Sequence, residues 1–125
     1  MYFKGDVNEV FPWKEDEKDR CLMVEISLTL KESDDIYQVS TKEKEECTIF
    51  ECSKDAIGYI QQLIDNSVTY DAEKLDWMFL DVGSKSRSNP IIRFIGRTLN
   101  TSERDITYTI RVCKVKFIRG ESNEQ

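Results

Sequence analysis

The stretch "LMVEISLTL", residues 22–30, decides the fold of this chain. Its apolar positions share one phase, with Met23, Glu25, Ser27 and Thr29 between them; they are Leu22, Val24, Ile26, Leu28 and Leu30. Successive side chains of a strand point to opposite faces. This period of two therefore predicts a strand with one buried face and one solvated face.

Further strands are predicted on both sides of this one, over residues 36–40, 47–52, 90–99 and 105–119. "KESDD" at 31–35 predicts a turn, because Ser and Asp side chains bond their own backbone there, and "TKEKEE" at 41–46 predicts a polar connection. Residues 71–82 favour a brief helical turn at 71–75 followed by a strand. The alternative is one helix, with Asp71 as its N-cap and Gly83 as its C-cap.

The last strand, residues 105–119, contains a change of apolar phase. Ile106, Tyr108, Ile110 and Val112 share one face, and the apolar residues after them, Cys113, Val115 and Phe117, share the other. A one-residue shift of this kind predicts a β-bulge, or a strand that passes from one sheet to another.

"SKDAIGYIQQLIDN", residues 53–66, predicts an amphipathic helix. Ser53 and Asp55 favour its N-terminus through capping and the helix dipole, and Asn66 favours its end. The apolar residues at helical spacing are Ala56, Ile57, Ile60, Leu63 and Ile64. This stripe is expected to cover the sheet.

These elements predict an α+β fold. It is an antiparallel, strongly bent sheet, or a small sandwich or half-barrel, of five to seven strands with the one main helix packed across it. Residues 1–125 are expected to form a single domain, in which 1–20 are partly irregular with Phe11, Pro12 and Trp13 as anchors, and 120–125 are expected to be a disordered tail. The expected core comprises Leu22, Val24, Ile26, Leu28, Ile57, Ile60, Ile64, Ile110 and Val112.

The composition excludes several classes of site. The chain has no histidine, so Ser-His-Asp and Cys-His arrangements are impossible within it. Its four cysteines lack the paired spacing of a zinc site and are expected to be free, buried thiols. No cofactor and no metal are expected. The absence of a signal peptide or a long apolar run favours a cytoplasmic location.

Charge is distributed unevenly along the sequence. Residues 1–81 hold 9 Lys/Arg and 20 Asp/Glu, a net charge of −11, and residues 82–125 hold 9 Lys/Arg and 4 Asp/Glu, a net charge of +5. Such asymmetry indicates a charged partner. The alternative is that the two halves interleave in one domain and partly neutralise each other.

The loop "VGSKSRSNP", residues 82–90, lacks the second glycine of a phosphate-binding loop and leads into a strand. Amides of residues 83–86 can still form a small anion nest, and the plainer interpretation is a flexible hairpin loop. A basic surface is predicted at Lys85, Arg87, Arg93 and Arg97, of which Arg93 and Arg97 share one face of a strand.

The function predicted from this charge pattern is non-enzymatic. A small acidic protein of this kind suits inhibition by occlusion of a basic site on a toxin or a nucleic-acid enzyme, as immunity proteins and phage inhibitors do. The acidic residues assigned to this surface are Glu15, Asp16, Glu17, Asp19, Glu43, Glu45 and Glu46.

Three other functions remain open. Acidic and basic faces can stack subunits head to tail into rings or tubes, with strand 105–119 pairing across subunits if it forms an open edge. The basic half can bind nucleic acid weakly, with Phe94, Tyr108 and Phe117 as stacking aromatics. An enzyme without histidine would need carboxylates or lysines that converge in a pocket.

Overall fold

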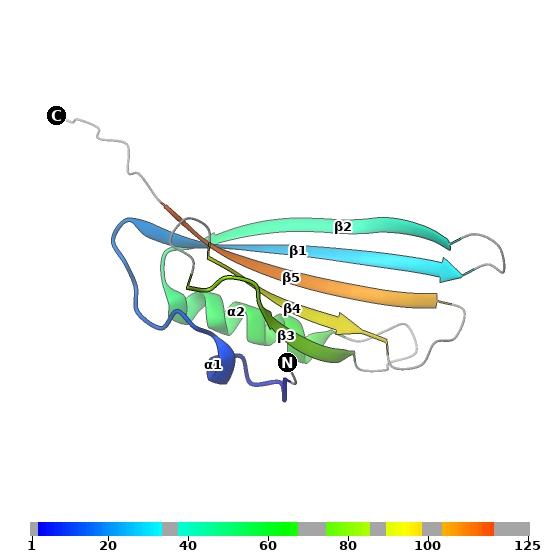
Figure 1. Cartoon of the computed structure of the whole chain (residues 1–125), viewed down its shortest axis with the longest axis horizontal. Helices are drawn as coiled ribbons and strands as arrows, with labels where there is room; N and C mark the ends of the chain where they lie inside the picture. Colours follow the sequence, from blue (N-terminus) through cyan, green and yellow to red (C-terminus); the bar gives the residue numbers. More distant parts are fainter. Residues whose placement is uncertain (1–2, 34–37, 68–74, 86–89, 99–103, 117–125) are drawn as a thin grey trace.

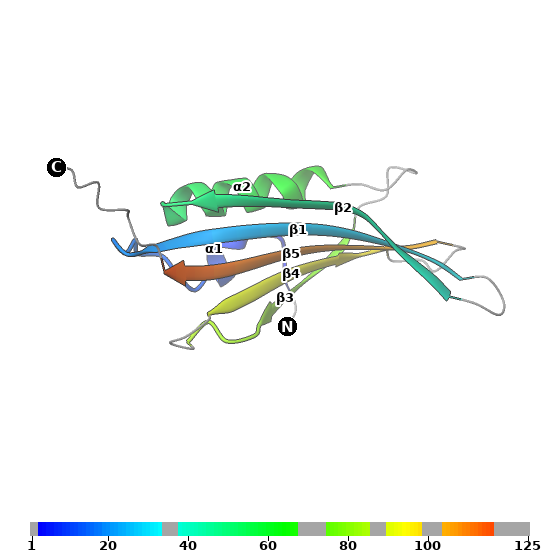
Figure 2. The same ribbon diagram turned by 90° about the horizontal axis from the view of Figure 1, so that it is seen from above.

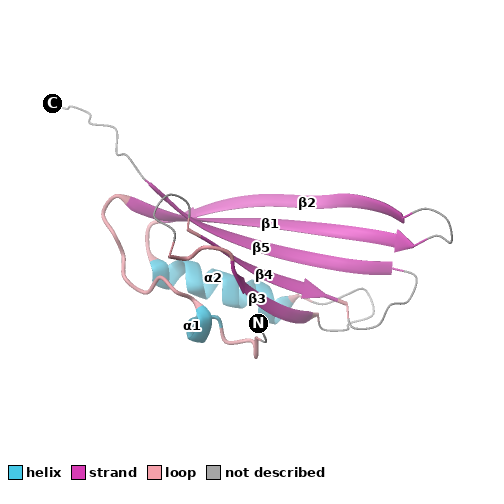
Figure 3. Ribbon diagram, in the orientation of Figure 1, coloured by secondary structure: helices cyan, strands magenta, loops and turns pink. Residues whose placement is uncertain are grey.

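The computed structural model describes residues 3–33, 38–67, 75–85, 90–98 and 104–116, without the side chains of 30–33, 38–45 and 104–105. Two helices and five strands make up this part of the chain (Figures 1 and 3). Their bounds, in chain order, are α1 Val7–Val10, β1 Arg20–Ser33, β2 Gln38–Phe50, α2 Ser53–Asn66, β3 Asp76–Asp81, β4 Ile91–Arg97 and β5 Arg104–Lys116.

The strands form one antiparallel sheet in the order β2-β1-β5-β4-β3. Helix α2 follows β2 and precedes β3, which are the two edge strands, so the chain crosses from one edge of the sheet to the other through this helix (Figure 2). The α+β fold predicted from the sequence is confirmed. Of the predicted sheet forms, the chain adopts a single open sheet.

The core lies between α2 and the face of the sheet that we call the inner face. Leu22, Val24 and Ile26 of β1 are buried there, opposite residues of β5 that include Ile110 and Val112. The predicted core residues Ile60 and Ile64 are also buried, whereas Leu28 and Ile57 are half-buried. The period of two in residues 22–30 therefore indicated the buried face correctly.

The N-terminal segment completes the cover of the inner face. Phe3, Val7, Phe11 and Trp13 are buried in the same core as the sheet, so the predicted anchors Phe11 and Trp13 are confirmed, and Pro12 is exposed. Gln61 of α2 holds this segment, because its Oε1 accepts from Val7 N at 2.8 Å and its Nε2 donates to the carbonyl of Gly5 at 2.6 Å.

Strand β2 is longer than the sequence suggested. The predicted connection 41–46 lies inside it, and β1 continues through residues 31–33 of the predicted turn. The predicted strands 36–40 and 47–52 therefore belong to one element, apart from residues that are not described or that lie beyond Phe50. Strand β2 is an edge strand, where charged side chains are tolerated and oppose aggregation. Its alternating Lys and Glu residues therefore resembled a polar connection, and the sequence did not indicate a strand there.

Strand β5 contains no bulge. Its pairing with β1 runs without a shift from Arg104 to Lys116, and its pairing with β4 is equally regular. The change of apolar phase instead reflects its central position, because Val112 on the inner face and Cys113 on the other face are both buried. The register shift lies between β1 and β2, at Leu28 and Thr29.

Candidate protein-binding surfaces

The sheet interleaves the acidic and basic halves of the sequence. Strands β4 and β5, from the basic half, lie between β1 and β2 on one side and β3 on the other, all from the acidic half. Two ion pairs join the halves directly, Glu25 with Arg111 and Glu17 with Lys114. Much of the charge asymmetry is therefore neutralised within the domain, which leaves the edges of the sheet as the places where one sign can accumulate.

Two of the predicted acidic residues in segment 15–19, Asp16 and Glu17, make contacts within the chain. Asp16 Oδ1 accepts a hydrogen bond from Ser53 N, at 2.7 Å, and so caps α2 from outside the helix. Cys52 at the N-cap position makes no side-chain cap, and the predicted capping role of Ser53 is wrong: Ser53 is the donor. The bonds from Ser53 hold the pKa of the Asp16 carboxyl below its usual value.

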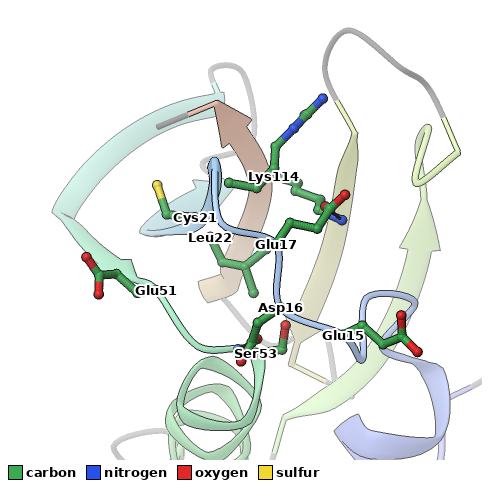
Figure 4. Close-up of a pocket in the computed structure, with 9 residues that line it drawn as sticks. Glu15, Asp16, Glu17, Cys21, Leu22, Glu51, Ser53 and Lys114 are labelled. Atoms are coloured by element: carbon green, nitrogen blue, oxygen red, sulfur yellow. Dashed lines mark hydrogen bonds and ion pairs between the residues drawn. The ribbon is translucent and has the colours of Figure 1, made fainter. Parts of the chain in front are cut away.

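Figure 4 shows the same region as a small crevice. Its walls come from the 15–17 segment, the start of β1, the first residues after β2 and Lys114 of β5. The enclosed volume is about 10 Å³, which is space for roughly one water and far below a small-molecule site. Burial raises the pKa of the Cys21 thiol at this place, with a further contribution from Glu51, so Cys21 stays protonated.

The other predicted acidic residues, Glu43, Glu45 and Glu46, lie on the edge strand β2. Glu51 follows the end of this strand and shares the crevice with Glu15, Asp16 and Glu17. Sequence reasoning missed Glu51, although it lies inside the stretch "CTIFEC" that indicated a strand. From Glu43 to Glu51 the chain advances eight residues, about 26 Å at strand spacing.

We call the acidic residues on β2, after its end and in the 15–19 segment the acidic rim. It consists of Glu15, Asp16, Glu17, Asp19, Glu43, Glu45, Glu46 and Glu51. The side chains of Glu43 and Glu45 are outside the described part of the structure, and the other six are exposed.

The predicted basic residues do not gather into one patch. Lys85 is exposed in the turn after β3, whereas Arg97 is exposed at the opposite end of β4. Arg93 is half-buried in the middle of β4 and shares the face of Arg97, as predicted. Arg87 lies outside the described residues.

The predicted anion nest is filled by the chain itself. Asp81 Oδ1 accepts from the amides of Gly83, at 3.1 Å, and Ser84, at 2.7 Å. The hydrogen bonds from Ser84 keep the pKa of Asp81 below its usual value. Trp13 Nε1 donates to the carbonyl of Ser84 at 3.1 Å and fixes the turn to the core. Residue 86, the last of the proposed nest, is not described.

The residues that nucleic-acid binding and head-to-tail assembly require lie in unsuitable positions or outside the described ranges. Phe94 is fully buried, so it cannot stack on a base, and Phe117 is not described. Tyr108 is half-buried against Trp77. Strand β5 is internal to the sheet, so the open edge that head-to-tail pairing required is absent at β5. The four cysteines are free, and Cys21 and Cys113 are buried, whereas Cys47 is exposed and Cys52 half-buried.

No group of three potential metal ligands occurs among the described residues. One open hollow of about 430 Å³ lies beside Trp77 and holds Lys4, Asp65 and Asp76. Within the described ranges, no helix has the length and apolar character needed to cross a membrane.

The face of the sheet opposite α2, which we call the outer face, carries apolar side chains that the sequence analysis did not assign to a surface. Ile49 of β2 is 63% exposed and Met78 of β3 is 40% exposed. Met23, Ile91 and Ile95 lie between them by register and are half-buried. Period-two alternation could have identified this set, since these residues occupy the phase opposite the core in each strand.

Comparisons with protein-family models, curated proteins and solved structures found no match to this chain.

Proposed function

We propose that this protein is a non-enzymatic binding protein that inhibits a partner by occluding a basic site on it. The acidic rim makes the contact. The observation that carries this proposal is the position of Glu43, Glu45 and Glu46 on the edge strand β2, whose pairing strand is β1, so that no strand of the basic half is paired with it. The partner expected is a protein whose basic surface serves a toxin activity or nucleic-acid binding.

The shape of the rim also supports the proposal. An edge roughly 26 Å long matches the span of a standard protein–protein interface better than a small-molecule pocket. Acidic groups on such an edge raise the association rate with a basic surface and orient the approach. Asp16 and Glu17 are partly committed to Ser53 and Lys114, so the test below leaves them unchanged and removes charge from β2 alone.

The test compares two variants of equal net charge. The rim variant is Glu43→Gln, Glu45→Gln and Glu46→Gln. The control is Glu9→Gln, Asp55→Asn and Asp65→Asn, three exposed residues of α1 and α2. Wild-type protein immobilised as bait is expected to retain a protein from lysate of its own source cells at about 0.1 M salt and to release it at about 1 M salt.

The rim variant is expected to bind that protein at least about tenfold more weakly, a loss of about 1.4 kcal/mol, and the control is expected to bind like wild type. The captured protein's activity should fall when wild-type protein is added. Equal binding by both variants, salt-independent binding, or no captured protein at low salt would each refute the proposal.

A further inference from the structure

The geometry points to a second binding surface: the outer face takes a segment of another protein that carries an apolar stripe and a carboxylate opposite Arg93. This surface goes beyond the acidic rim, because it extends over the face of all five strands, whereas the rim follows the edge strand β2 and its adjoining segment, and because it prefers the opposite charge. The surface consists of a row of side chains across the middle of the sheet and the apolar residues on both sides of it.

The row contains one residue from each strand. In register across the sheet it consists of Cys47, Glu25, Arg111, Arg93 and Leu80. Glu25 Oε1 pairs with Arg111 Nη1 at 2.5 Å. Arg93 lies directly opposite Arg111 on the next strand, and like charges in that position are destabilising.

Arg93 is the unsatisfied member of this row. Its Nε is buried and has no hydrogen-bond partner in the described structure. A buried donor without an acceptor costs free energy, and the cost is larger for a charged group. The row thus holds two guanidinium groups and one carboxylate, and a second carboxylate would satisfy Arg93 with the short, strong bonds typical of Arg–carboxylate pairs.

Apolar side chains flank the row. On one side, Ile49, Met23, Cys113 and Ile91 lie in register across four strands. On the other side Ile95 pairs with Met78, and Thr109 and Ser27 continue that line across β5 and β1. Contiguous apolar surface with a few polar groups inside it is typical of an interaction site. Binding energy concentrates where apolar anchors surround a desolvated charge pair.

The charges argue against a second copy of this chain as the occupant. In a face-to-face dimer whose two-fold axis passes through this row, Glu25 of each copy would already be paired with Arg111, and Arg93 of one copy would face the two guanidinium groups of the other. A segment of a different protein that carries both an acidic side chain and an apolar stripe supplies the carboxylate for Arg93 and covers the apolar residues of the face.

The experiment selects such a segment directly. The probe is a displayed library of random peptides about 16 residues long, enough for a helix to cross the five strands. We expect selected peptides to combine regularly spaced apolar residues with an Asp or Glu. The best peptide is then synthesised, and its Kd is measured for wild type, for Arg93→Gln and for the matched control Arg97→Gln, which changes an exposed arginine of the same face.

Arg93→Gln is expected to raise the Kd at least about tenfold, and Arg97→Gln less than about twofold. Changing the peptide carboxylate to its amide should raise the wild-type Kd by the same factor and leave the Kd for Arg93→Gln almost unchanged. The change in the peptide tests the proposal even if the Arg93→Gln protein does not fold. The melting midpoint of that variant reports whether it folds.

Four outcomes would overturn the proposal. The first is that the selected peptides show no enrichment in Asp or Glu, and the second is that no peptide is selected. The third is that Arg93→Gln and the change of the peptide carboxylate to an amide have additive effects on the binding free energy. The fourth is that the selected peptide still binds the Ile49→Glu variant. A dimer of the wild type in light scattering that Ile49→Glu dissociates would assign the face to a second copy instead. None of these outcomes depends on the acidic rim, so the two proposals fail independently.

Discussion

Gly96 of β4 has space for a hydrogen atom and nothing larger. A Cβ built there would lie 2.7 to 2.9 Å from three ring atoms of Trp77 on the neighbouring strand. The Trp77 ring is itself buried and packs edge-on against Tyr108, with centroids 5.6 Å apart. The ring therefore has little freedom to move aside, and the glycine is required by this packing.

We predict that Gly96→Ala lowers the free energy of unfolding by about 1–2 kcal/mol, since overpacking costs about 1–3 kcal/mol and alanine recovers part of that in backbone entropy. The matched control is Gly58→Ala on α2, where a Cβ meets nothing within 4 Å. It should raise stability by about 1 kcal/mol through helix propensity. Urea titration measures both. Equal stability of Gly96→Ala and wild type would mean that Trp77 repacks freely.

At the scale of elements, the sequence predicted those segments whose local pattern matches their final environment. Strand β1 and helix α2 each bury one face, so period two and helical spacing identified them. Strand β2 was predicted only in part, because an edge strand with Lys-Glu alternation resembles a solvated connection. Strand β5 was predicted as a strand, but the bulge inferred from its change of apolar phase was wrong, because a central strand buries both faces. The cap of α2 came from Asp16, a contact across 37 residues that no local pattern contains.

The candidate surfaces also depend on contacts between distant residues, which no local sequence pattern contains. The acidic residues were predicted as exposed charges, but their arrangement along one edge follows from the strand order. Arg93 was predicted correctly to share a face with Arg97. That it lies beside Arg111, and lacks an acceptor, depends on the pairing of β4 with β5.

The cap on α2 yields a prediction with a defined pH dependence. Asp16→Ala should lower the melting midpoint at neutral pH, because the first-turn amide of Ser53 loses its acceptor, whereas Glu15→Ala should leave it unchanged. The hydrogen bonds from Ser53 make the pKa of Asp16 lower in the folded state than its ordinary value of 3.8. Its stabilisation is therefore complete above pH 3.8 and is lost as pH falls through the folded-state pKa.

Melting curves of wild type and Asp16→Ala between pH 7 and pH 3 measure this effect. The gap between their midpoints should be constant at the upper end of that range and should narrow at the lower end. A gap that does not change with pH would show that the Asp16 charge makes no contribution to capping.

At the scale of the whole molecule, the N-terminal segment and the sheet share one core, and this makes the domain cooperative. Phe11 is 1% exposed and packs edge-on against Trp13, with ring centroids 5.7 Å apart. Trp77, the second tryptophan, lies on β3 in the same core. The two tryptophans therefore report on the N-terminal segment and on the sheet, and two-state unfolding requires their fluorescence and the far-UV circular dichroism to change together.

We predict a single transition for the wild type, and a loss of about 3–5 kcal/mol for Phe11→Ala. Because domains of this size are stable by only about 5–15 kcal/mol, that loss removes a large share of the total stability and should clearly lower the denaturation midpoint. Pro12→Ala, one residue along and exposed, should change stability by less than about 0.5 kcal/mol. If tryptophan fluorescence changed at lower denaturant than circular dichroism, the N-terminal segment would be a separate, weaker unit, and the single cooperative core would be refuted.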